Sequence, residues 1–213
     1  MWCDSQLEMM KLVLAVMADT TPQEVDCAYL YGNTPDNELS PLMKGVELWK
    51  SGGVPRILLC GGGIYAPHGV NAYNGGDAWE DYLVKNGVER NAIRQIPRPE
   101  LSHTDTEARN LVFCCKSRGW KRVIVTCVTH QQVRGFVNTI TYAVRYYPEL
   151  KVYSVPGKPL PWQDESLYSQ GNIQGSRISD GVAAEYERLE RWHAKDDLLS
   201  CAEVLDYLKQ RDS

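Results

Sequence analysis

Two histidines, His103 and His130, stand beside residue types that cap helices and bind anions. Their polar neighbours are Thr104, Glu107, Thr129 and Arg134. The positive end of a helix dipole lowers the proton affinity of a nearby imidazole, which favours a neutral donor or a general acid/base. Arg134 lies about one helical turn after His130 and could offer a planar pair of donors to a phosphate or carboxylate. The spacing therefore indicates anion binding, with proton transfer by His130.

Both segments also have a purely structural interpretation. Thr104 and Glu107 have the spacing of a capping box, in which each side chain binds a backbone amide of the other. Thr129 and Gln132 repeat that spacing. Capping alone explains these four residues and leaves the histidines as neighbours of a cap, so both interpretations stay open.

A glycine cluster and an acidic residue form a further candidate group. Gly61, Gly62 and Gly63 follow an apolar run, and their backbone amides could approach a phosphate or carboxylate closely because no side chain blocks the way. The cluster is neither Gly-x-Gly-x-x-Gly nor a Walker loop, so a tight turn explains it as well. Asp77 opens the next predicted helix, where a carboxylate also interacts favourably with the helix dipole.

Composition and motif searches exclude several classes of function. His-Glu-x-x-His, Gly-x-Ser-x-Gly and Cys-x-x-Cys are all missing from the sequence, which argues against a metal site, a serine hydrolase and a zinc knuckle. The formal charge of −4 gives no basic excess for nucleic acid. The seven cysteines are odd in number and several lie in apolar runs, which favours a reducing, cytoplasmic location. The apolar stretch at 12–18 is far shorter than a membrane span.

The elements that must position these residues alternate along the chain. Apolar runs at 27–31, 57–60, 123–128 and 151–155 predict strands, and stripes of helical period lie between them, the longest at 130–147. This alternation predicts a Rossmann-like three-layer α/β domain with a mainly parallel sheet over residues 25–160. Residues 1–24 and 161–213 are predicted as helical segments packed on it in a single globular unit.

In such a sheet, ligands bind beyond the carboxyl ends of the strands. Gly32 and Asn33, which follow the first strand, therefore join the predicted ligand-binding residues. The long loop at 61–76 lacks periodicity and is interpreted either as a lid over the site or as a surface excursion.

The motifs taken in order resemble the SanA/YdcF/ElyC-like family, a domain of unknown function, over residues 25–160. The first three motifs are a strand ending in glycine at 26–32, Leu-Trp-Lys-Ser-Gly at 48–52, and a strand ending in a glycine cluster at 56–63. Asp77 then opens a helix that leads to Gly87-Val88. A segment with Ser102, Thr104 and Glu107 follows, and the last motif is a strand followed by His130 and Arg134. The chain departs from the family pattern in having Gly-Asp-Ala where Ser-Glu-Ala is usual, and His-x-x-x-Arg in place of His-x-x-Arg.

The resemblance implies a small-molecule ligand. SanA and ElyC proteins carry membrane anchors, whereas this chain is more similar to the soluble YdcF branch, for which S-adenosylmethionine binding has been proposed. We expect a small anionic or nucleotide-like ligand, held at the glycine cluster and at the helix starts near Thr104 and Thr129, with Asp77 or Glu107 orienting polar groups. The chain is then either a metal-independent transferase or hydrolase, or a non-catalytic binding module related to envelope maintenance.

Overall fold

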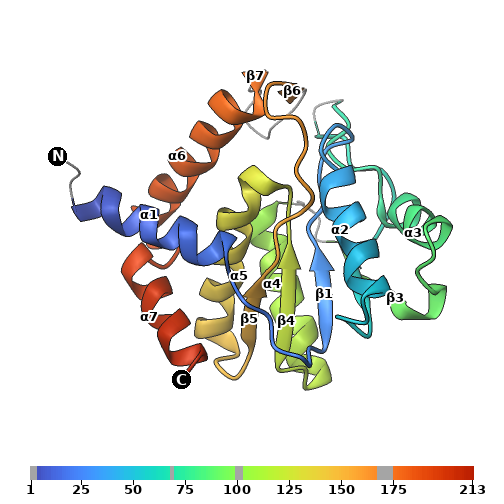
Figure 1. The fold of residues 1–213 in the computed structure, drawn as a ribbon, viewed down its shortest axis with the longest axis horizontal. Helices are drawn as coiled ribbons and strands as arrows, with labels where there is room; N and C mark the ends of the chain where they lie inside the picture. The colour runs from blue at the N-terminus through green and yellow to red at the C-terminus, as the bar shows by residue number, and fades with distance from the viewer. Residues whose placement is uncertain (1–3, 68–69, 99–102, 167–174) are drawn as a thin grey trace.

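A computed structural model of the chain describes residues 4–67, 70–98, 103–166 and 175–213. Its centre is a five-stranded parallel sheet between two layers of helices (Figure 1). The strands are β1 (Cys27–Leu30), β2 (Ile57–Cys60), β3 (Ile93–Ile96), β4 (Arg122–Thr126) and β5 (Lys151–Ser154), in the order β3-β2-β1-β4-β5. The predicted Rossmann-like α/β fold is therefore confirmed.

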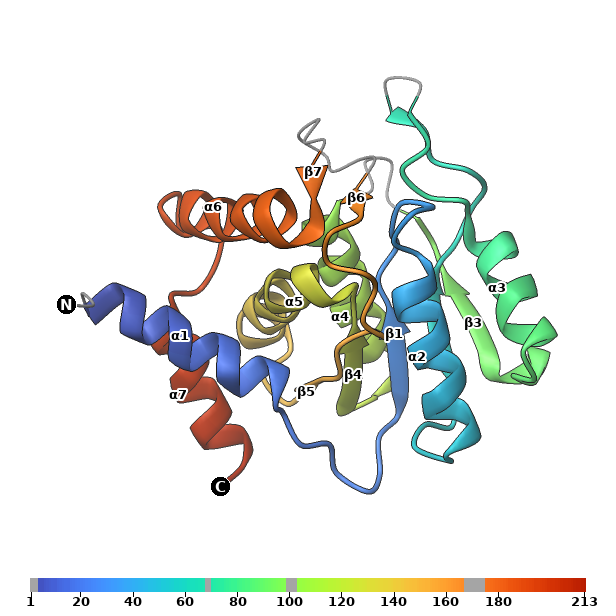
Figure 2. The same cartoon turned by 45° about the horizontal axis from the view of Figure 1, so that its top comes forward.

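Helices cover both faces of the sheet and extend beyond its β5 edge. The α-helices of the described residues are α1 (Asp4–Met17), α2 (Leu39–Lys50), α3 (Gly76–Lys85), α4 (Thr104–Arg118), α5 (Gln132–Tyr146), α6 (Val182–His193) and α7 (Cys201–Arg211). Helices α2 and α3 pack on one face and α4 and α5 on the other, while α1 and α7 pack together beside α5 (Figures 1 and 2). No described helix has both the length and the apolar content needed to cross a membrane.

Shorter elements complete the connections. They are the helical turns η2 (Arg90–Ala92), η3 (Thr129–Gln131) and η4 (Arg177–Gly181), and the small antiparallel pair β6 (Glu165–Ser166) and β7 (Gly175–Ser176). The predicted helix at 130–147 is thus divided into η3 and α5. Two helix ends have the usual capping residues: Gly119 closes α4 in the left-handed conformation at φ 67°, and Ser200 forms a capping box with Glu203 at the start of α7.

The central strand β1 is buried on both faces, which is why it reads as a continuous apolar run. Cys27 and Tyr29 belong to the core under α4 and α5, whereas Ala28 and Leu30 belong to the core under α2 and α3. In-register pairing of Ala28 with Ile57 on β2, and of Leu30 with Thr126 on β4, brings the carboxyl ends of three strands to one edge. The loops that carry the candidate residues begin at this edge.

The sequence pattern missed strand β3. Its two central residues, Arg94 and Gln95, are not buried, because β3 is the last strand of the sheet and its middle faces outward. Only Ile93 and Ile96 reach the core, so the segment lacks the apolar run that marks the interior strands.

Candidate functional site

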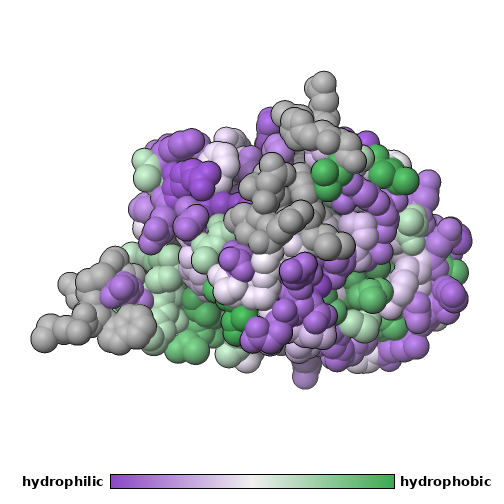
Figure 3. All heavy atoms as spheres, turned by 90° about the horizontal axis from the view of Figure 1, so that it is seen from above, coloured by the Kyte–Doolittle hydropathy of each residue, from purple (hydrophilic) through white to green (hydrophobic). Residues whose placement is uncertain are grey.

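The site lies where the direction of the sheet reverses. From β1 the chain proceeds outward through β2 to β3, then returns to β4 on the other side of β1 and continues to β5. The loops that follow β1 and β4 therefore run to opposite faces of the sheet and leave a crevice between them, which is the usual ligand position in an open parallel sheet. Figure 3 looks down on this edge, where hydrophilic residues predominate among those drawn in colour.

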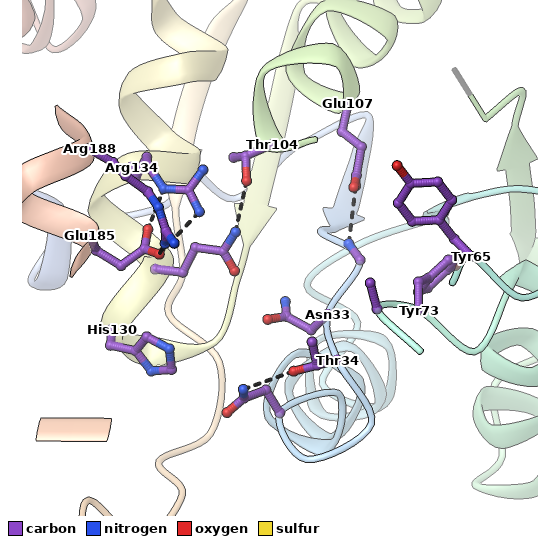
Figure 4. Close-up of a pocket in the computed structure, with 14 residues that line it drawn as sticks. Asn33, Thr34, Tyr65, Tyr73, Thr104, Glu107, His130, Arg134, Glu185 and Arg188 are labelled. Carbon is purple, nitrogen blue, oxygen red and sulfur yellow. Dashed lines mark hydrogen bonds and ion pairs between the residues drawn. The ribbon is translucent and has the colours of Figure 1, made fainter. Parts of the chain in front are cut away.

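A cavity of about 80 Å³ fills this crevice, and we call it the crevice pocket. It brings together six of the predicted site residues: Gly32, Asn33, Thr104, Glu107, His130 and Arg134. Further lining residues include Thr34, Asn37, Tyr65, Tyr73, Gln131, Glu185 and Arg188 (Figure 4). Since one buried water needs roughly 10–15 Å³, the pocket has the size of a phosphate, a carboxylate or a few waters.

Glu107 joins the first turn of α4 to the end of β1. Its side chain is 5% exposed, and Oε2 accepts hydrogen bonds from the Tyr29 hydroxyl at 2.8 Å and from the Gly32 amide at 3.1 Å. The predicted capping box of Thr104 with Glu107 is wrong. His103 is the cap residue, and its amide donates to Thr106 Oγ1 at 2.9 Å, so Glu107 lies one position further round the helix, on the inner side.

Arg134 is buried beside the pocket and paired with a carboxylate from the C-terminal segment. Its Nε and Nη2 both donate to Glu185, which also accepts from Arg188 one turn later on α6. Burial opposes the charge of Glu185, but the charge and hydrogen bonds of Arg134 together with the charge of Arg188 outweigh it and hold the pKa of the Glu185 carboxyl below its ordinary value. The cluster therefore carries two positive charges against one negative charge.

Glu185 and Arg188 were missed by sequence reasoning. They belong to a run of alternating acidic and basic residues in a terminal helix, a pattern that is typical of a solvated helix face. Nothing in that run distinguishes the two residues that face inward. Only the packing of α6 above α5 shows that they form one wall of the pocket (Figure 4).

His130 lines the pocket, and its surroundings favour the neutral form of the imidazole. Burial lowers the pKa of its imidazole, and the positive charges of Arg177 and Arg134 act in the same direction, while Glu185 opposes them. Its Nδ1 is buried and has no hydrogen-bond partner among the described residues. Gly181 packs against the ring: a Cβ built there would lie 3.5 Å from His130 Cδ2. Solvent is thereby kept from one side of the imidazole.

Two amide side chains of the pocket are held by their nitrogens. Asn33 Nδ2 donates to the Tyr31 carbonyl at 3.0 Å, and Gln131 Nε2 donates to Thr104 Oγ1 at 2.9 Å. The side-chain carbonyl oxygens of Asn33 and Gln131 have no further partner within the described part of the chain. The pocket thus offers amide oxygens as hydrogen-bond acceptors, in addition to the guanidinium donors of Arg134 and Arg188.

The long loop after β2 supplies the opposite wall. Tyr65 and Tyr73 pair as an antiparallel bridge, and the Tyr73 hydroxyl donates to the Cys60 carbonyl at 2.7 Å. Asn74 and Trp79 both donate to Glu38 on the loop before α2. These bonds fix the described part of the loop as a wall of the pocket, and His68 on the same loop lies outside the described residues.

The glycine cluster does not line the crevice pocket. The Gly61 amide donates to the Ile96 carbonyl at 2.8 Å, and the Gly62 carbonyl accepts from the Gly76 amide at 2.8 Å. Arg98 covers the turn and donates to the Gly63 carbonyl at 2.6 Å. The cluster forms a tight turn that joins β2, the end of β3 and the start of α3.

Three other predicted residues also lie outside the crevice pocket. Asp77 is exposed on α3 and accepts from Gln95 Nε2 at 2.9 Å. Thr129 Oγ1 is 3.4 Å from the Gly157 carbonyl, and His103 lines a larger neighbouring cavity. The predicted capping box of Thr129 is wrong as well.

The partner predicted for that second box, Gln132, is fully buried. Its Oε1 accepts from the Cys127 amide at 2.7 Å, and its Nε2 donates to the Val125 carbonyl and to Ser154 Oγ, both at 2.9 Å. Gln132 thus ties the end of β4 to β5, because the strand ends leave backbone groups that need partners inside the core.

Comparison with known proteins leaves the geometry as the main guide to function. Ser102, part of the resemblance, is outside the described residues. Among those residues, no group of three or more His, Cys, Asp or Glu side chains is arranged to hold a metal ion. No protein-family model matches the chain, and no curated protein matches its sequence, so membership of the SanA/YdcF/ElyC-like family stays a prediction.

Proposed function

We propose that the crevice pocket binds the anionic group of a small, nucleotide-like metabolite. The observation that carries the proposal is the position of Arg134, which is 9% exposed and lines the pocket beside the neutral His130. Its Nε and Nη2 are bound to Glu185, whereas its Nη1 makes no hydrogen bond to a described residue. A phosphate or carboxylate would complete this arrangement, since a buried guanidinium needs partners for all of its donors.

The size of the pocket limits which part of a ligand it holds. Pockets that enclose a whole small molecule usually measure about 300–1,000 Å³, whereas the crevice pocket measures about 80 Å³. Only a head group fits. S-adenosylmethionine, the candidate that the resemblance suggests, would place its carboxylate against Arg134 and the rest of the molecule outside the pocket.

His130 is the group best suited to proton transfer. As a neutral imidazole beside the anion position it would act as a general base in a metal-independent transferase or hydrolase reaction. One observation favours the second candidate function, a non-catalytic binding module: no described carboxylate is hydrogen-bonded to Nδ1 to orient the ring, as catalytic histidines usually require. A reducing, cytoplasmic location belongs to the same proposal, and the buried thiols of Cys27 and Cys127 support it.

A thermal-shift screen tests the proposal. The ligands are inorganic phosphate, sugar phosphates, nucleotides, S-adenosylmethionine and its demethylated product. A ligand at 100 times its Kd stabilises the fold by about 2.7 kcal/mol, which is roughly 5–11 °C for a chain of this size. We expect such a shift in the wild type and in Asp77→Asn, whose side chain lies outside the pocket, and a shift smaller by about a third in Thr34→Val, which removes a pocket hydroxyl.

His130→Asn separates the two candidate functions. In a transferase or hydrolase it lowers turnover by about 10² to 10⁴ while the ligand still binds. In a binding module it changes affinity alone. If no anion shifts the melting temperature of the wild type, the proposed function is refuted.

A further inference from the structure

A second, larger cavity adjoins the crevice pocket. It measures about 490 Å³ and lies between α4, α5 and α6, and we call it the side chamber. Thr104, Arg134 and Arg188 line both cavities, so the arginine side of the crevice pocket is also a wall of the side chamber. The chamber has the volume of a typical small-molecule site, which the crevice pocket lacks.

The side chamber contains a polar side chain whose oxygen accepts no hydrogen bond within the described part of the chain. Asn138 lies one turn after Arg134 on α5 and is 3% exposed. Its Nδ2 donates to the Arg134 carbonyl at 2.8 Å, which leaves its Oδ1 available as an acceptor. An amide oxygen accepts up to two hydrogen bonds, so this oxygen suits the amino group of a ligand.

Apolar and aromatic side chains line part of the chamber. Ala184 and Leu198, which are 4% and 3% exposed, are apolar, and Trp192 adds an aromatic ring that is 41% exposed. Aromatic rings of this kind stack on the flat faces of heterocycles. The other lining residues are charged or titratable: His103, Asp105, Glu187, Arg191 and Asp197. An acceptor and an aromatic ring in one chamber match a flat ring that carries an amino group.

We infer that the side chamber binds the heteroaromatic base of the same ligand whose anionic group occupies the crevice pocket. The inference rests on the proposed function, because Arg134 is the common wall that sets the distance between the two groups. The ligand is therefore a nucleoside derivative with an anionic end, in which Asn138 Oδ1 accepts from the exocyclic amine and Trp192 covers one face of the base.

Two matched pairs of probes test this inference by isothermal titration calorimetry. AMP is compared with ribose 5-phosphate, and S-adenosylmethionine with methionine, because the members of each pair differ by the base or nucleoside. We expect the member with the base to bind more tightly to the wild type in at least one pair. Asn138→Leu then weakens that member about fivefold, the usual effect of one hydrogen bond, and leaves the other member unchanged.

Trp192→Ala provides a second variant with little risk to folding, since this side chain is already 41% exposed. It is expected to weaken the base-bearing ligand at least fivefold, as the loss of one stacked ring does. Phe113→Ala is the matched control, because Phe113 is similarly exposed, at 38%, and lines neither cavity.

The possible failures are distinguishable. If the base-free ligands bind but the base adds no affinity, or if neither chamber variant changes the preference for the base, the side-chamber inference is overturned and the proposed function stands. If no member of either pair binds the wild type, the proposed function fails and this inference fails with it.

Discussion

Removing the charge of Glu185 leaves Arg134 buried without its counter-charge. In the native protein the side chains of Arg134 and Glu185 are only 10% and 7% exposed, and Arg188 pairs with the same carboxylate. Breaking a buried pair by neutralising one partner costs about 3–5 kcal/mol, because the remaining charge is desolvated and uncompensated. For a chain of this length, Glu185→Gln is therefore expected to lower Tm by roughly 6–20 °C.

A double variant shows whether this loss comes from the orphaned charge. Replacing both partners by apolar residues, in Arg134→Met with Glu185→Leu, removes the buried charges together and is often close to neutral in other proteins. Urea denaturation of the wild type, both single variants and the double variant gives the coupling energy. The reasoning is refuted if the double variant is as unstable as the sum of the two single variants.

The same pair predicts a pH dependence. The pKa of Glu185 is lower in the folded state than its ordinary value of 4.5 because Arg134 and Arg188 together outweigh the effect of burial. The contribution of this ionised group to the free energy of unfolding is fully present above about pH 4.5 and is lost as the pH falls through the folded-state pKa. The stability difference between the wild type and Glu185→Gln should shrink over that acidic window and stay constant above it.

Three further predictions concern the pocket and its support. The pKa of His130 is below its ordinary value of 6.5 in the folded state. Its contribution to stability is therefore present above pH 6.5 and falls as the pH drops through the folded-state pKa. His130→Asn should flatten the curve of Tm against pH below pH 6.5. Tyr29→Phe removes the hydroxyl that donates to Glu107 and should cost about 1–3 kcal/mol in urea denaturation, whereas an unchanged midpoint would show that this bond is not needed. Gly135→Ala places a methyl group against the buried Cys127 thiol, directly after β4, and should lower the free energy of unfolding by about 1–3 kcal/mol. In the control Gly63→Ala the added methyl group meets nothing within 4 Å, so Tm should stay close to that of the wild type.

The interior strands of the sheet were predictable because residues buried on both faces are almost all apolar. Strands β1, β2 and β4 are buried on both faces and appear in the sequence as short, continuous apolar runs. Strand β3 was not predictable in this way, since an edge strand exposes its middle and loses the pattern. The capping boxes at Thr104 and Thr129 failed for a related reason: spacing alone does not say whether a side chain turns back to its own helix or inward to the sheet.

The candidate site was likewise predictable only in part. The order of apolar runs and helical stripes placed Gly32, Asn33, His130 and Arg134 beyond strand ends, because the carboxyl ends of parallel strands must share one edge. The sequence alone could not separate them from the glycine cluster, which follows a strand equally well. In the structure that cluster is occupied by contacts with Arg98 and with the start of α3.

Local patterns of apolar and polar residues were enough to predict the class of fold and the edge of the sheet at which a site is expected. Which polar residues meet at that edge depends on how the whole chain packs. Helix α6 begins 50 residues after α5 starts, yet it brings Glu185 and Arg188 to Arg134 and lines the side chamber. Such contacts depend on how distant helices pack, and a charged helix carries the same sequence pattern whether it faces water or another charge.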